Sequence, residues 1–128
     1  MNKISILNIL LVGSGGFLGS VLRYLVGLVT QYLARSASFP YGTLAVNVLG
    51  CLMIGYLGGI AQYRNIGTPE IRLFLFTGLL GGFTTFSTFG YDTFNLGRNL
   101  DLPIAFLNIF LHIALGLGAV FTGYIISR

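Results

Sequence analysis

Four neutral side chains that donate hydrogen bonds stand out in a chain that is otherwise strongly apolar. They are Thr43, Asn47, Ser87 and Thr88. Hydroxyl and amide groups can donate to an anion, and because they carry no charge of their own, the anion can also leave again, as conduction requires. Thr43 and Asn47 are four residues apart, so they would share one face of a helix. Asn47 has a second interpretation, since an asparagine within a membrane often joins two helices by hydrogen bonds.

Two phenylalanines and one arginine extend this set. Phe86 and Phe89 are three residues apart, and the positive edges of their rings could meet an anion; ordinary packing is the alternative. Arg23 lies ten residues before Leu33, which is about 15 Å along a helix axis. This is deep for a side chain that must reach the membrane surface, so we expect Arg23 to face protein or a water-filled vestibule. The alternative is that it pairs with backbone carbonyls at a helix contact.

The inventory of reactive side chains argues against an enzyme. The chain has one His, one Cys and three acidic residues, and their spacing supports no catalytic triad, metal cluster or pair of carboxylates. The first 69 residues contain no acid, and only Asp92 lies inside an apolar segment. A proton-coupled exporter normally keeps a carboxylate within the membrane, so a small multidrug exporter would have to depend on Asp92.

Residues 81–89, with the sequence GGFTTFSTF, interrupt the third apolar segment. Each of two adjacent glycines costs a helix about 1 kcal/mol relative to alanine, and threonine hydroxyls compete for backbone hydrogen bonds. In lipid, freed backbone groups are tolerated only where protein or a polar cavity meets them. The sequence therefore predicts a helix broken at mid-membrane, with carbonyl and hydroxyl groups turned inward. Such breaks bind ions and substrates in many transport proteins.

Composition places the chain in the membrane. Of its 128 residues, 55% are hydrophobic and only 8% are charged, against about 25% charged in soluble domains, and the mean hydropathy is +0.87. The net charge of +4 comes from residues scattered singly at segment ends, which argues against nucleic-acid binding. Gly15 and Gly19 are spaced for close helix packing. We predict one all-α domain, residues 1–128, with four transmembrane spans at about 4–33, 43–61, 70–97 and 102–126.

Together these motifs closely resemble the Fluc (CrcB) family of fluoride channels. The resemblance covers essentially the whole chain, including residues 16–23, the sequence GTLAVN at 42–47 and the 81–89 stretch. It implies a fluoride-specific ion channel that exports fluoride passively across the cell membrane, the inner membrane in a Gram-negative bacterium, and so lowers cytoplasmic fluoride and its toxicity. It also implies an antiparallel homodimer of dual topology, with two fluoride pores, in the lipid bilayer.

The resemblance also implies roles for individual residues. Those that match the fluoride pathway of the family are Asn47, Phe86, Phe89, Thr43, Ser87, Thr88 and Arg23. Gly81 and Thr84 match positions whose backbone carbonyls hold a structural Na⁺ that is shared across the dimer axis and is not transported. This agrees with a helix break that exposes carbonyl oxygens, which are suitable ligands for a small cation.

Two departures from the family pattern concern the polar lining of the pore. Some relatives carry Ser-x-Glu after the last phenylalanine, where this chain has Gly90, Tyr91 and Asp92. Some carry a hydroxyl on the fourth helix four residues after the histidine, where this chain has Gly116. The rival hypotheses are an exporter of organic cations, in which Asp92 would be essential, and an assembly subunit that transports nothing and needs no donor-lined path.

The distribution of basic residues bears on orientation. Four spans place the N-terminus, the 62–69 loop and the C-terminus on one side. The basic residues of that side are Lys3, Arg64, Arg72 and Arg128, and those of the other side are Arg35 and Arg98. Four against two is a weak signal under a rule that depends on Lys/Arg asymmetry, so insertion in both directions is expected. In an antiparallel pair the two broken stretches would face each other, each covering the other's exposed backbone.

Overall fold

The computed structural model describes residues 5–35, 38–64 and 67–128, and every regular element in these ranges is a helix. Four helical segments are long and apolar enough to cross a membrane: Ile6–Ala34, Tyr41–Tyr63, Pro69–Arg98 and Leu102–Ile126. The predicted all-α membrane fold with four spans is thereby confirmed. The predicted start of the first span at Ile4, and the charge of Lys3, lie outside the described residues.

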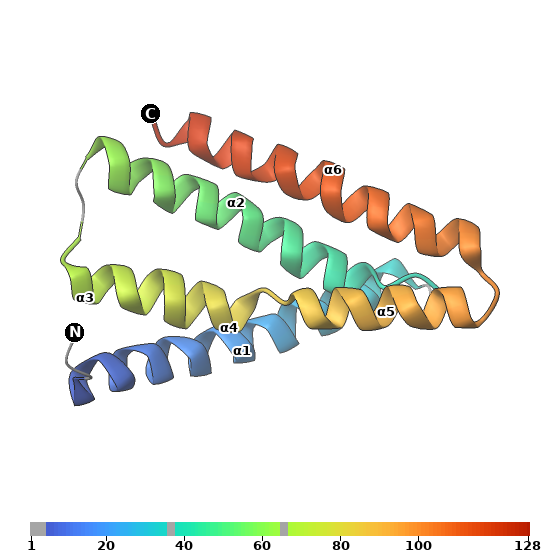
Figure 1. The fold of residues 1–128 in the computed structure, drawn as a ribbon, viewed down its shortest axis with the longest axis horizontal. Coiled ribbons are helices and arrows are strands. Elements are labelled where there is room, and N and C mark those ends of the chain that lie inside the picture. Colours follow the sequence, from blue (N-terminus) through green and yellow to red (C-terminus); the bar gives the residue numbers. More distant parts are fainter. Residues whose placement is uncertain (1–4, 36–37, 65–66) are drawn as a thin grey trace.

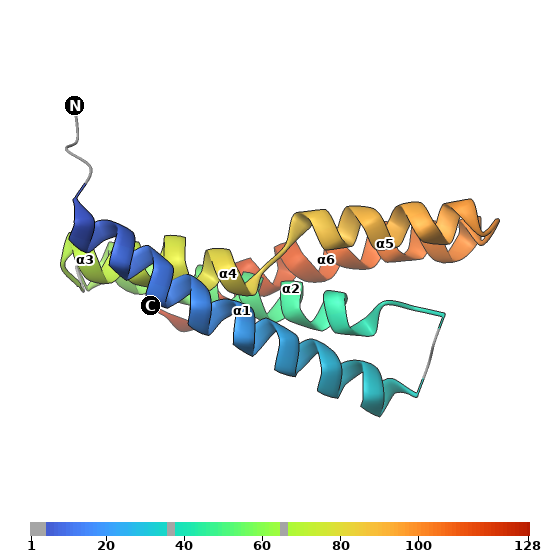
Figure 2. The same cartoon turned by 90° about the horizontal axis from the view of Figure 1, so that it is seen from below.

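The helices pair in two layers. The first span is α1 (Ile6–Ala34), which runs along the first half of the third span (Figure 2). The second span, α2 (Tyr41–Tyr63), lies beside the fourth, α6 (Leu102–Ile126), along most of its length (Figure 1). The C-terminus, the end of α2 and the start of the third span lie at the same end of the molecule.

The third span is divided near its middle. Its elements are α3 (Pro69–Arg72), the π-helix η1 (Leu73–Leu80), α4 (Gly81–Phe83) and α5 (Phe86–Arg98). Between α4 and α5 the chain is extended at Thr84 (φ −85°, ψ 157°) and Thr85 (φ −152°, ψ 120°). The break falls within the stretch that the sequence singled out.

The two threonines, rather than the two glycines, form the break. Gly81 and Gly82 both remain helical. A Cβ on Gly82 would lie only 2.6 Å from the carbonyl oxygen of Gly16, so this glycine is needed for contact with α1. The expectation that the glycines themselves weaken the helix here was therefore wrong in its mechanism.

Glycines let backbones approach closely in both helix pairs. A Cβ on Gly15 would lie 2.7 Å from the carbonyl oxygen of Phe74 in η1, and one on Gly19 would collide with the η1 backbone. In the other pair, a Cβ on Gly55 of α2 would collide with the backbone of Val120 in α6. The close packing predicted at Gly15 and Gly19 is confirmed, and these contacts fix the frame around the break.

Candidate functional site

The amide of Asn47 clamps the broken backbone. The Thr85 N–H donates to Asn47 Oδ1 at 2.9 Å, and Asn47 Nδ2 donates to the Thr85 carbonyl at 3.0 Å. Both backbone groups of Thr85 are thus paired with one side chain of α2. Asn47 joins two helices, as one of its interpretations predicted, and it still has a second amide N–H that could serve an ion.

Two carbonyl groups at the break have lost their helical partners. In a continuous helix the Thr85 N–H would bond to the Gly81 carbonyl, and the Thr88 N–H to the Thr84 carbonyl. Instead the Thr85 N–H donates to Asn47. The Thr88 N–H donates to the Thr85 hydroxyl oxygen at 3.2 Å. The carbonyls of Gly81 and Thr84, the two that the family resemblance relates to Na⁺, are therefore released from the helix.

Hydroxyl groups surround the start of α5. Thr85 caps the helix by accepting the Thr88 N–H. Its hydroxyl also lies 3.2 Å from Ser87 Oγ and 3.1 Å from Thr88 Oγ1. The Thr84 hydroxyl instead turns back and donates to the Leu80 carbonyl at 3.1 Å. Ser87 and Thr88 are therefore joined through Thr85, a residue that the sequence did not assign to the site.

An aromatic pocket of about 430 Å³ opens on one side of the break. Asn47, Phe86 and Phe89 line it together with Gly81 and Thr84. The ring centroids of Phe86 and Phe89 are 5.6 Å apart with a tilt of 57°, so their edges are accessible from different directions. Phe86 is 83% exposed and faces outward from the subunit. The structure thus gathers five of the predicted site residues at one place.

A second, more polar pocket of about 490 Å³ lies between α1, α2 and α5. Arg23, Thr43 and Thr88 line it with Asp92, so the half-buried Arg23 faces a cavity, as expected. Thr43 Oγ1 donates to Asp92 Oδ2 at 2.7 Å. The single O–H of Thr43, which the sequence offered as a free donor, is engaged by this carboxylate.

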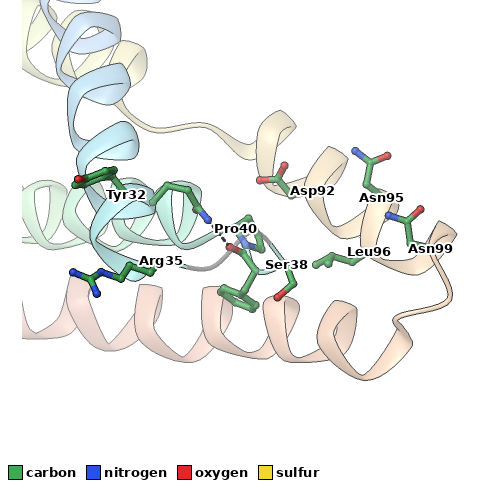
Figure 3. A pocket seen from close by; sticks show the side chains of 10 residues that line it. Tyr32, Arg35, Ser38, Pro40, Asp92, Asn95, Leu96 and Asn99 are labelled. Carbon is green, nitrogen blue, oxygen red and sulfur yellow. Dashed lines mark hydrogen bonds between the residues drawn. The ribbon is translucent and has the colours of Figure 1, made fainter.

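A third, larger pocket of about 810 Å³ lies beyond Asp92, toward the far end of α5 (Figure 3). Asn95 and Asn99 line it from α5, and Arg35 lines it from the end of α1. Asp92 borders both this pocket and the second one, and Thr85 borders both the second pocket and the aromatic one. The three pockets are therefore neighbours that share lining residues, from the end of α5 to the break.

A polar cluster joins α5 to α6 at the aromatic pocket, which His112 also lines. Asn108 Nδ2 donates to Thr93 Oγ1 at 2.9 Å, and the Thr93 hydroxyl donates to the Phe89 carbonyl at 2.8 Å. His112 Nδ1 lies 3.0 Å from the Asn108 carbonyl, and the His112 ring lies 4.3 Å from the Phe89 ring, centroid to centroid. These contacts give His112 a packing and hydrogen-bonding role.

Several residues of the site were not predicted from the sequence. Thr85 offered one signal, a threonine at the N-cap position before a helix resumes. Asp92 was considered as the acid of an exporter and as a departure from the family pattern, but its bond to Thr43 was not predicted. Thr93 gave no signal, because its partner Asn108 is 15 residues away. Ser87 was named and lies beside Thr85, outside the lining of these three pockets.

A family model described as "CrcB-like protein, Camphor Resistance (CrcB)" matches residues 10–124. The chain belongs to this family. Similar to this CrcB-like chain are proteins named fluoride-specific ion channel FluC. The one from Flavobacterium psychrophilum is 46% identical over 114 residues, covering 89% of this chain and 91% of the relative. The one from Chlorobaculum tepidum is 44% identical over 121 residues, covering 94% of each. The one from Elusimicrobium minutum is 47% identical over 114 residues, covering 89% and 88%. The resemblance to the Fluc (CrcB) family is thereby confirmed.

Proposed function

We propose that this CrcB-like protein is a fluoride-specific ion channel that lets fluoride leave the cell passively. Its family and the names of its relatives support the proposal. The observation that carries it is the series of three neighbouring pockets, which share Asp92 and Thr85 as lining residues and include the neutral donors Asn47, Thr43 and Thr88. The family and the names of the relatives support a channel and not an enzyme.

Fluoride enters cells as its weak acid and dissociates in the less acidic cytoplasm. A passive anion leak in the cell membrane, the inner membrane in a Gram-negative bacterium, then lowers the cytoplasmic concentration. Such a leak requires binding that is favourable enough to strip water from the ion and weak enough to release it. Amide, hydroxyl and ring-edge groups meet this requirement better than fixed cations would.

Asn47 has two tasks in this proposal. It holds the Thr85 backbone with its oxygen and one N–H, and its second N–H donates to fluoride in the aromatic pocket. The edges of Phe86 and Phe89 meet the ion from other directions. Ser87 and Thr88 supply hydroxyls beside the break.

The second pocket serves as the approach to the break. Arg23 provides positive charge there, and Thr88 contributes a hydroxyl. Because Thr43 donates to Asp92, its O–H reaches fluoride only after that hydrogen bond opens. The Asp92 carboxylate, paired in this way, repels the anion less than a free carboxylate would.

We further propose that the Gly81 and Thr84 carbonyls hold a structural Na⁺ that is not transported. The support is that the break frees these two carbonyls from their helical partners, since the N–H groups of Thr85 and Thr88 bond elsewhere. Two carbonyls cannot complete a coordination sphere, so a second copy would supply further oxygens. Rigorous exchange of Na⁺ for a large organic cation should reduce efflux and lower the melting temperature of the protein. Thr84→Ser keeps the carbonyl and should be tolerated, and full activity without Na⁺ would contradict a required ion.

The assembly that fits this site is an antiparallel homodimer of dual topology. Phe86 and Gly81 are exposed on the single subunit, so a partner placed across the break would enclose the aromatic pocket. A cysteine introduced by Asn99→Cys, in a Cys51→Ala background, should be labelled from both faces of the membrane in cells. Labelling from one face alone would rule out dual topology.

Fluoride efflux from liposomes that contain only this protein tests the function. We expect efflux in response to a fluoride gradient alone, with no proton gradient and no comparable chloride efflux. Phe86→Ile should reduce it strongly, because the ring edge is lost at similar bulk. An exporter of organic cations would instead need a proton gradient and Asp92, and an assembly subunit would show no flux.

A further inference from the structure

The polar cluster between α5 and α6 breaks a rule that buried groups normally obey. Asn108 is 0% exposed, yet its Oδ1 has no hydrogen-bond partner among the described residues, and the same is true of the buried His112 Nε2. Buried polar atoms are nearly always paired, and an unpaired acceptor destabilises the fold. An apolar residue at position 108 would avoid this cost. Local violations of this kind are expected where a residue serves function instead of stability.

The partners in this cluster fix which group donates each hydrogen bond and which group accepts it. The Thr93 hydroxyl has one proton, which goes to the Phe89 carbonyl. Its oxygen must then accept, so the NH₂ group of Asn108 faces it. Likewise the Asn108 carbonyl can only accept, so His112 donates from Nδ1. The buried side chain of Asn108 therefore fixes Thr93, and through it the backbone at Phe89. The backbone carbonyl of Asn108 separately holds the His112 ring, which lies against Phe89.

Hydrogen bonds matter more for α5 than for its neighbours, because α5 has no buried residue. A helix without buried side chains is poorly fixed about its own axis by packing. Three side chains from other helices hold it by hydrogen bonds: Asn47 at the N-cap residue Thr85, Thr43 at Asp92, and Asn108 at Thr93. Only the last acts from α6, and it acts at the turn that carries Phe89.

We propose that Asn108 is a positioning residue for the ion pathway, whose side chain holds the Phe89 ring in place through Thr93. The inference rests on the proposed function, since Phe89 matters as a ring edge that meets the ion. Asn108 itself is fully buried and touches no ion. Its removal lets α5 turn, so that the Phe89 edge leaves its position in the aromatic pocket.

Substitution of Asn108 should lower fluoride efflux without lowering thermal stability. Asn108→Leu removes the hydrogen bond at similar size, and we expect fluoride efflux to fall about tenfold, the effect of one net hydrogen bond. The melting temperature should stay the same or rise, because the unpaired amide oxygen is gone. Thr93→Val should lower efflux by a similar factor, and the double variant should be no worse than either single one. Thr93→Ser keeps the hydroxyl and should restore most of the efflux.

A spectroscopic readout separates this inference from the function itself. Site-specific 4-fluorophenylalanine in place of Phe89 should give a fluorine resonance that shifts with Asn108→Leu, whereas the same label in place of the exposed Phe121 of α6 should not shift. The resonance shift tests the positioning role independently of transport. Absence of fluoride flux in the native protein would overturn the proposed function alone. An unmoved Phe89 resonance, or full efflux in Asn108→Leu, would overturn the positioning role. If Asn108→Leu does not fold, the Thr93→Val and Thr93→Ser pair decides by the same two measurements.

Discussion

The two halves of the third span are held in opposite ways. The first half, up to Phe83, buries Gly78, Leu80 and Phe83 and touches α1 backbone to backbone. The second half, α5, buries nothing and is held by side-chain hydrogen bonds from α2 and α6. Close packing fixes shape but leaves no room for an ion, whereas hydrogen bonds fix position and leave polar groups and cavities beside the helix. The division explains why the pockets cluster around α5.

The sharpest way to test this difference is to add bulk to one glycine in each half. Gly82→Leu should destabilise the fold by about 3 kcal/mol, the upper part of the range for overpacking, because its Cβ would lie 2.6 Å from the Gly16 carbonyl oxygen. Gly90→Leu in α5 is the matched control, since a Cβ there meets nothing within 4 Å. Thermal unfolding in detergent measures both variants. Equal destabilisation would mean that the two halves are packed alike.

The next largest effect is expected at the clamp between the halves. Asn47→Asp keeps an acceptor for the Thr85 N–H but places a second oxygen against the Thr85 carbonyl and a negative charge in the aromatic pocket. Like-charge juxtaposition costs several kcal/mol, so we expect fluoride efflux to fall by a factor of about a hundred or more. Asn47→Leu, which carries no charge, shows how much of the loss comes from the released backbone. Efflux near the native rate in both variants would exclude Asn47 from the pathway.

A smaller effect should follow from uncapping α5. Thr85→Val removes the acceptor of the Thr88 N–H, and loss of an N-cap costs about 1 kcal/mol. Thr85→Ser retains the cap and should unfold at nearly the native temperature. If Thr85→Val were as stable as Thr85→Ser, the start of α5 would be held by Asn47 alone.

The smallest effect is expected from a single hydroxyl. Ser87 is exposed and bonds only the Thr85 hydroxyl at 3.2 Å among the hydrogen bonds found in the described residues. Ser87→Ala should therefore reduce efflux by less than about tenfold, the effect of one net hydrogen bond near 1 kcal/mol, and should leave thermal stability unchanged. A loss as large as that of Asn47→Asp would show that this hydroxyl is a principal ligand.

The sequence predicted the four-span fold and the stretch, residues 81–89, in which the break lies, because both follow from local composition. It could not place the break at Thr84 and Thr85, since the cost of a helical Gly82 is offset by a contact with Gly16, a residue distant in sequence. It also presented Thr43 as a free donor, because its partner Asp92 is 49 residues away. The two interpretations of Asn47 competed in the sequence, yet the amide has enough hydrogen-bonding groups for both.

The sequence also suggested that a second copy must cover the broken backbone. In the structure, the N–H and C=O of Thr85 are already paired with Asn47 of the same chain. The carbonyls of Gly81 and Thr84 are among the groups that remain for an external ligand. The pairing of Thr85 within its own chain could not be predicted, because no local sequence pattern shows that α2 lies beside the break.

The Asn47 clamp also has a consequence for biogenesis. Asn47 precedes Thr85 by 38 residues, so α2 is synthesised before the third span. The break can then close during synthesis, before α6 has been made, and the newly inserted subunit does not present bare Thr85 groups to the lipid. The subunit therefore already has its break paired at Thr85 while α6 is still being synthesised.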